Sequence, residues 1–149
     1  MKKKYVPFLK VKEYIKNIDS KIDQSSWIPD IIISINRGGC IPGIFISHMR
    51  GLNHEVLTLN KQLNDFNDEF IKKIMISNSS ILIFDDINDT GDTLSNIKNK
   101  FRDYNIDLRF AVLINNKSSS FKVDYYGSEI DKKIDNSWIV FPWENIDGE

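Results

Sequence analysis

The sequence predicts an α/β fold in which a central, mostly parallel sheet is flanked by helices. Three continuous apolar runs, at residues 31–33, 81–84 and 110–114, are typical of strands that are buried on both faces. Between these runs, apolar residues recur at the spacing of amphipathic helices. This alternation predicts βαβ units around a parallel sheet. The chain has 149 residues and no internal repeat or hinge-like linker, which fits a single domain over 1–149.

Each element is predicted from its own pattern. Apolar residues such as Val11, Ile15 and Ile18 fall on one face of a helix over about 9–22. A second helical pattern ends near Gly51, a typical helix stop. In chain order, the sequence predicts a helix over about 9–22, a strand over 31–33, a helix over 41–49, a strand over 56–59, a long loop with a helical turn over 60–80, a strand over 81–84, a helix over 94–101, and strands over 110–114 and 139–141.

Charge and cysteine content narrow the function classes. Lys and Arg number 20 against 21 Asp and Glu, and this near-neutral balance argues against a dedicated nucleic-acid-binding protein. The single cysteine, Cys40, excludes an internal disulfide and predicts a cytoplasmic protein. No apolar stretch reaches the roughly 18 residues that a membrane-spanning helix needs.

The segment that follows the strand at 81–84 carries the most specific motif, DDINDTGDT over residues 85–93. Thr90, Gly91 and Thr93 lie where a loop enters a helix, so backbone N–H groups, hydroxyls and the helix dipole would together suit a phosphate. The adjacent acids Asp85 and Asp86 suit the hydroxyl groups of a ribose, or a nearby Mg²⁺. The segment therefore predicts a sugar-phosphate site.

A simpler explanation is that the acids end a strand and that Thr90 or Asp92 caps a helix. Capping does not account for the residue types at six positions of this segment: Asp85, Asp86, Asp89, Thr90, Gly91 and Thr93. The chance that all six match at any one starting point in a sequence is on the order of 10⁻⁸ to 10⁻⁷. The segment 81–93 resembles the phosphoribosyl pyrophosphate (PRPP) loop of type I phosphoribosyltransferases. The resemblance implies that family's fold, with a small C-terminal hood and a mobile loop. It also assigns the 5′-phosphate site to five consecutive residues: Asp89, Thr90, Gly91, Asp92 and Thr93.

A second strand end carries Asn36-Arg37-Gly38-Gly39, which resembles the family's pyrophosphate loop. Arg37 and exposed backbone amides would hold a highly charged leaving group at another helix N-terminus. Alone, this tetrapeptide is also typical of an ordinary tight turn. The resemblance implies a non-proline cis peptide between Asn36 and Arg37.

Two later features resemble the xanthine-guanine and hypoxanthine-guanine branch of the family. Lys117 matches a lysine that reads the purine O6, although surface solvation is the ordinary role of a lysine. Trp138 matches an aromatic residue that stacks on the base, and Ile139 a residue whose backbone contacts the base. Core or interface packing is the alternative for Trp138. Glu144 matches an acid near the metal and the pyrophosphate.

The resemblance implies transfer of the phosphoribosyl group from PRPP to a 6-oxopurine, which gives a nucleoside 5′-monophosphate. Asp85 and Asp86 would orient the ribose, and Asp89 would accept the N7 proton of the base. Mg²⁺ is the implied cofactor, held by Asp85, Asp86 and Glu144 directly or through water. A homo-oligomer, dimer or tetramer, is also implied, with Trp27 or the N-terminal helix available for an interface.

The sequence departs from the family over residues 60–69. The family's mobile loop carries a Ser-Tyr pair or a basic residue, whereas this segment is acidic, with Lys61, Lys72 and Lys73 as its nearby cations. This departure favours an alternative: a catalytically weak or inactive regulator that binds PRPP or nucleotides. His48 and His54 are expected to pack rather than to react. Cys40 begins a helix, a position that would lower the pKa of its thiol.

Overall fold

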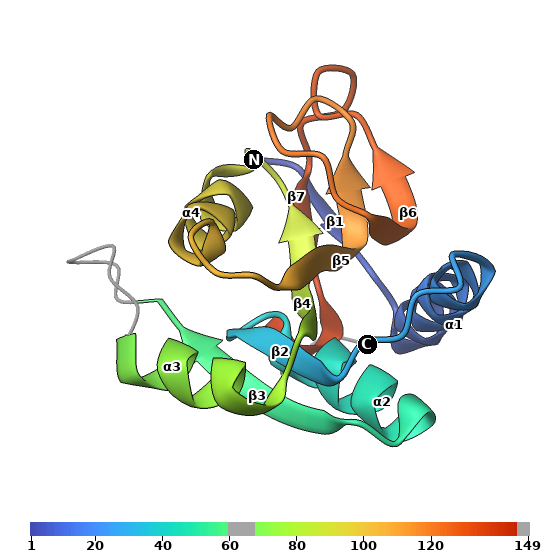
Figure 1. Ribbon diagram of the computed structural model, residues 1–149. Coiled ribbons are helices and arrows are strands. Elements are labelled where there is room, and N and C mark those ends of the chain that lie inside the picture. Colours follow the sequence, from blue (N-terminus) through green and yellow to red (C-terminus); the bar gives the residue numbers. More distant parts are fainter. Residues whose placement is uncertain (60–67, 146–149) are drawn as a thin grey trace.

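The computed structural model describes residues 1–59 and 68–145. Five parallel strands form one sheet in the order β3-β2-β4-β5-β6, and four helices flank it (Figure 1). The strands are β2 (Ile31–Asn36), β3 (Asn53–Thr58), β4 (Ser80–Asn88), β5 (Asp107–Asn116) and β6 (Tyr125–Ile130), and the helices are α1 (Phe8–Gln24), α2 (Cys40–Arg50), α3 (Asp68–Ser77) and α4 (Asp92–Phe101). Because the strands are parallel, their carboxyl ends share one edge, where ligands bind in open α/β sheets.

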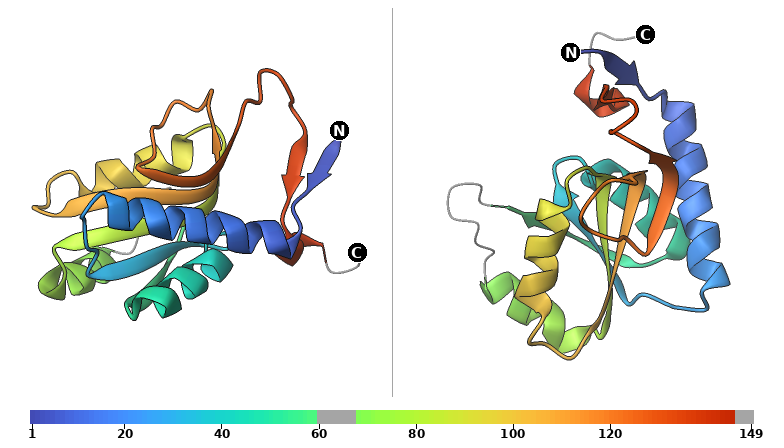
Figure 2. Two further views of the ribbon diagram at one scale, coloured as in Figure 1. Left: turned by 90° about the vertical axis from the view of Figure 1, so that its right-hand side faces the viewer. Right: turned by 90° about the horizontal axis from the view of Figure 1, so that it is seen from above.

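Side chains of the central strands alternate between two apolar layers. Ile32, Leu82 and Phe84 belong to a cluster that includes residues of α1 and α2. Their neighbours Ile33 and Ile83 belong to a second cluster with residues of α3 and α4. Figures 1 and 2 show helices on both faces of the sheet. Burial on both faces explains why the strands are apolar throughout, and the α/β prediction is confirmed.

A two-stranded parallel pair forms a small separate hood. It joins β1 (Lys3–Tyr5) to β7 (Trp138–Val140), and the short helix η1 (Pro142–Glu144) follows. Figure 2 shows this pair projecting from the main sheet beside the start of α1. The expected C-terminal hood is therefore present, but its partner strand comes from the N-terminal end of the chain.

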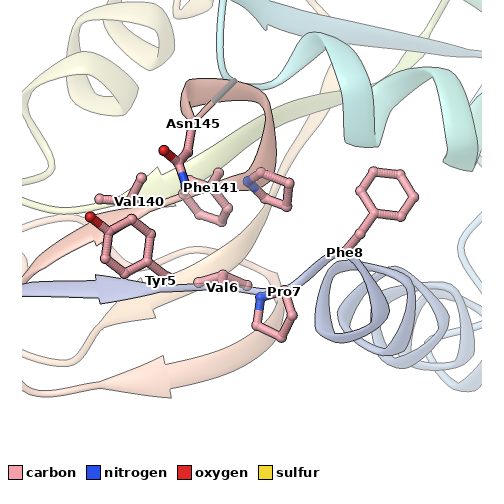
Figure 3. Close-up of a pocket in the computed structure, with 8 residues that line it drawn as sticks. Tyr5, Val6, Pro7, Phe8, Val140, Phe141 and Asn145 are labelled. Atoms are coloured by element: carbon pink, nitrogen blue, oxygen red, sulfur yellow. The ribbon is translucent and has the colours of Figure 1, made fainter. Parts of the chain in front are cut away.

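An apolar cavity of about 440 Å³ lies between the hood and the start of α1. In Figure 3, Tyr5, Val6 and Pro7 lie along the segment that leads into α1, and Phe141 and Asn145 face them from the hood. Among the residues that the structure describes, no charged side chain lines this cavity, and such a lining does not suit a sugar phosphate.

The structure corrects two expectations. A three-turn helix, α3, occupies much of the segment 60–80, where the sequence predicted a loop with one helical turn, because Ile71 and Ile74 are buried against the sheet. Residues 60–67, part of the expected mobile loop and the site of Lys61, lie outside the described residues.

Trp27 is only 8% exposed and its Nε1 donates to Asp107 Oδ2 at 2.8 Å, so its ring is not available for an interface.

Candidate functional site

The loop from β4 to α4 contains the residues to which the sequence analysis assigns the phosphate. Gly91 has a φ of 98°, a conformation that favours glycine, and it immediately precedes α4. The N-terminus of α4 therefore lies beside the exposed Thr90, whose Oγ1 donates to Asp92 Oδ2 at 2.9 Å and accepts from Asp92 N at 3.4 Å. Ser120 holds the loop in place, since its Oγ and its backbone N donate to Thr90 O at 2.8 and 3.0 Å.

Asp85 and Asp86 lie near the carboxyl end of β4, in a place that disfavours their charged form. Burial, followed by the charge of Asp86, raises the pKa of Asp85 well above its usual range. Burial raises the pKa of Asp86 to about 6, and the charge of Glu144 adds to the effect. No ion pair joins either carboxylate to a cation in residues 1–59 and 68–145. Partly buried acids of this kind suit a ligand that brings hydroxyl donors or a cation.

The segment 36–39 packs directly against these acids. The peptide bond between Asn36 and Arg37 is cis, as the resemblance implies, and Arg37 is exposed to solvent. A Cβ atom at Gly38 would overlap the Asp86 carboxylate, and one at Gly39 would overlap the backbone oxygen of Phe84. Glycine at both positions therefore allows the expected pyrophosphate loop to lie against β4.

Asp89 has a partner that the sequence analysis did not identify. Lys132 Nζ donates to Asp89 Oδ2 at 2.7 Å, and the lysine side chain is only 13% exposed. The same ammonium lies 5.7 Å from the centre of the Trp138 ring. Lys132 is one of many lysines in the sequence, and no local pattern distinguishes it.

Of the residues expected to bind the base, Trp138 lies beside the Asp89–Lys132 ion pair. Trp138 is 49% exposed, so part of its ring is open for stacking, whereas Ile139 is buried. Lys117 lies just after β5, where its backbone N donates to Ile130 O at 2.8 Å and its side chain is exposed. The ammonium in contact with Asp89 therefore belongs to Lys132 and not to Lys117.

Glu144 lies in η1 of the hood. Its negative charge contributes to the raised pKa of Asp86. Glu144 Oε2 also accepts a hydrogen bond from the Phe141 backbone N at 2.9 Å, so the side chain has a fixed position in η1. Within the described ranges, no group of three His, Cys, Asp or Glu side chains has the arrangement of a metal site.

The remaining candidates add no carboxylate or cation to this cluster, although Cys40 lies beside it, since its Sγ donates to Asn36 Oδ1 at 3.8 Å. Cys40 begins α2, but burial and the charge of Asp85 raise the pKa of its thiol, contrary to the sequence-based expectation. His54 hydrogen-bonds Ser34 Oγ at 2.7 Å beneath α2, and burial lowers its pKa. His48 is exposed. No helix in the described part of the chain is long and apolar enough to cross a bilayer.

The chain matches one protein family over most of its length and superposes on several solved structures. The pattern of the phosphoribosyl transferase domain family matches residues 7–145. A purine phosphoribosyltransferase from Pyrococcus horikoshii Ot3 superposes with a TM-score of 0.76 at 25% identity, over 100% of this chain and 98% of that one. A xanthine-guanine-hypoxanthine phosphoribosyltransferase from Helicobacter pylori gives 0.77 at 21% identity, over 97% and 94% of the two chains. A hypothetical protein from Neisseria gonorrhoeae with bound ppGpp gives 0.77 at 20% identity, over 99% and 92%.

Proposed function

The chain belongs to the phosphoribosyl transferase domain family, and we propose that it transfers the 5-phosphoribosyl group of PRPP to a 6-oxopurine base with release of pyrophosphate. The observation that carries this proposal is the contact between the two ligand loops. Gly38 lies directly against the Asp86 carboxylate, so the segments 36–39 and 85–93 form one continuous surface. A ligand with a phosphate at one end and a pyrophosphate at the other fits this arrangement.

PRPP would lie along this surface with its 5′-phosphate at residues 89–93. The helix N-terminus of α4 and the hydroxyls of Thr90 and Thr93 supply donors to the phosphate oxygens. Asp85 and Asp86 accept hydrogen bonds from the ribose hydroxyls, which compensate for the burial of the two acids. Arg37 neutralises charge on the departing pyrophosphate.

The donor set fits Mg²⁺ that is held largely by the substrate and water. The three carboxylates of Asp85, Asp86 and Glu144 are available, directly or through water, but they do not form a preorganised cage. When bound, Mg²⁺ would neutralise charge on the pyrophosphate leaving group.

The base would occupy the space between the hood and the PRPP loop. Trp138 stacks on its ring, the backbone of Ile139 contacts its edge, and Lys117 donates to O6. Asp89 accepts the N7 proton as the base attacks the anomeric carbon, where positive charge develops on the sugar. Aligning the base and the sugar in one site provides much of the rate enhancement.

A regulator that binds PRPP or nucleotides with little or no turnover is the second candidate. The acidic segment 60–69, which lacks the Ser-Tyr pair, favours it. The Neisseria gonorrhoeae protein with bound ppGpp is an example of a protein of this fold in complex with a nucleotide.

Pyrophosphate release from PRPP and Mg²⁺ distinguishes the two candidates. We expect release with guanine, xanthine or hypoxanthine, and little with adenine, uracil or orotate. Release with adenine alone would retain the transferase and reject the 6-oxopurine assignment. Binding of PRPP without release in the presence of any base would favour the regulator.

A further inference from the structure

A lysine from the segment before the hood lies inside the candidate base site. Lys132 Nζ is 2.7 Å from Asp89 Oδ2 and 5.7 Å from the centre of the Trp138 ring. Long lysine side chains usually extend into solvent, but this one is only 13% exposed. We propose that Lys132 is a positioning residue, which orients the Asp89 carboxylate toward the N7 proton of the base.

A hydrogen-bond network fixes the backbones of both partners. Asn116, at the end of β5, is 6% exposed. Its Nδ2 donates to Asp89 O at 2.9 Å, and its Oδ1 accepts from Lys132 N at 3.1 Å. Ser118 Oγ donates to the same Oδ1 at 2.9 Å. The lysine and the aspartate, 43 residues apart, are therefore held to one buried amide rather than meeting by chance at the surface.

The ion pair fixes the position of Asp89 Oδ2 and leaves Asp89 Oδ1 available to accept another hydrogen bond. The Asp89 side chain is 38% exposed and could otherwise rotate toward solvent. With Oδ2 bound to Lys132, Oδ1 is directed to accept a second donor, and N–H at position 7 of a purine is such a donor. The 5.7 Å separation from Trp138 is within the range of a cation–π contact, so the ammonium lies beside the surface on which the base would stack.

This inference rests on the proposed function, and its test needs variants that separate positioning from folding. Lys132→Met removes the ammonium but keeps the side-chain stem and the backbone N–H that donates to Asn116. Lys133→Met is the matched control, because Lys133 is the exposed neighbour. Lys132→Arg tests rescue by another cation, and Lys132→Gln is a second neutral variant if Lys132→Met lowers Tm.

Two guanine analogues report the position of Asp89 without turnover. 9-Deazaguanine carries an N7–H donor, whereas 7-deazaguanine has a C–H group there, and both keep the 6-carbonyl. In the presence of Mg²⁺ and pyrophosphate, we expect wild-type protein to prefer 9-deazaguanine, and Lys132→Met to lose roughly tenfold or more of that preference. With guanine and PRPP, kcat should fall by a similar factor while KM for PRPP changes less than about twofold. Lys132→Arg should recover part of both losses, and Lys133→Met should match wild type.

An equal loss of affinity for both analogues, or an unchanged kcat in Lys132→Met, would overturn the positioning role. A wild-type protein that turns over guanine but does not distinguish the analogues would overturn this inference alone. A wild-type protein that releases no pyrophosphate with any base would overturn the proposed function, and the inference with it.

Discussion

Replacing Asp86 by Asn should stabilise the protein at neutral pH while it removes activity. The pKa of Asp86 is about 6 in the folded chain, against about 3.9 in an unfolded one. The folded state therefore binds the proton more tightly, and this contribution to stability, present below about pH 4, is lost as the pH rises through 6. The difference of about two pKa units corresponds to about 3 kcal/mol. Asn keeps the shape of the side chain and carries no charge.

The measurement is thermal unfolding in EDTA without substrate, at about pH 4.5 and about pH 7.5. At the higher pH, a gain of up to about 3 kcal/mol corresponds to a Tm increase of roughly 5–10 °C for a domain of this size. At the lower pH the increase should be much smaller, because Asp86 is then largely protonated in the folded wild type. Asp103→Asn is the control, since Asp103 is 86% exposed, and its Tm should not change at either pH.

Adding PRPP and Mg²⁺ should reverse the order of stability. Wild type gains stability from the bound ligand, about 2.7 kcal/mol at a hundred times Kd, whereas Asp86→Asn gains little. An Asp86→Asn variant that is less stable than wild type at about pH 7.5, or whose Tm gain is the same at both pH values, would refute the reasoning.

Three further substitutions test the roles of individual residues. Asp89→Asn should lower kcat at least a hundredfold and change KM for PRPP less than about threefold, and unchanged turnover would remove Asp89 from proton transfer. Lys117→Ala should lower the ratio of kcat/KM for guanine over adenine roughly tenfold, whereas an identical base profile would contradict the O6 contact. Gly39→Ala should lower Tm by roughly 2–10 °C and weaken PRPP binding, because its Cβ would overlap backbone. Gly51→Ala is the control for Gly39→Ala: its positive φ of 63° disfavours a side chain, but no atom lies within 4 Å, so it should lower Tm without weakening PRPP binding.

The parts of the fold that the sequence predicts are those with burial on both faces or a fixed motif. The strands β2, β4 and β5 contain the apolar runs at 31–33, 81–84 and 110–114, because helices cover both faces of each. The structure extends each strand beyond its run, since polar residues such as Asn88 continue the backbone pairing. The cis peptide bond between Asn36 and Arg37 follows the resemblance rather than any physical pattern.

The parts that the sequence did not predict depend on contacts between distant segments. All three residues of β1 are exposed and read Lys-Lys-Tyr, so the strand has no apolar pattern, and its position depends on pairing with β7. The edge strand β6 is partly exposed, and its Gly127 allows close approach of Tyr14 from α1. The helix α3 lies in a polar, acidic segment in which Ile71 and Ile74 are the fully buried positions. Local patterns carry little information about such elements.

The distribution of cations fits the different roles that we propose for neighbouring acids in this loop. The Lys132 ammonium lies 2.7 Å from Asp89 Oδ2, where it would orient the carboxylate that we propose as the proton acceptor. Asp85 and Asp86 have no cation partner among the described residues, and burial raises the pKa of both carboxyl groups, so their charged form is disfavoured. Hydroxyl donors and a divalent ion would relieve that destabilisation, which fits the proposal that these two acids hold the ribose. The position of Lys132 would then separate the proposed proton acceptor from the two acids proposed to bind the sugar.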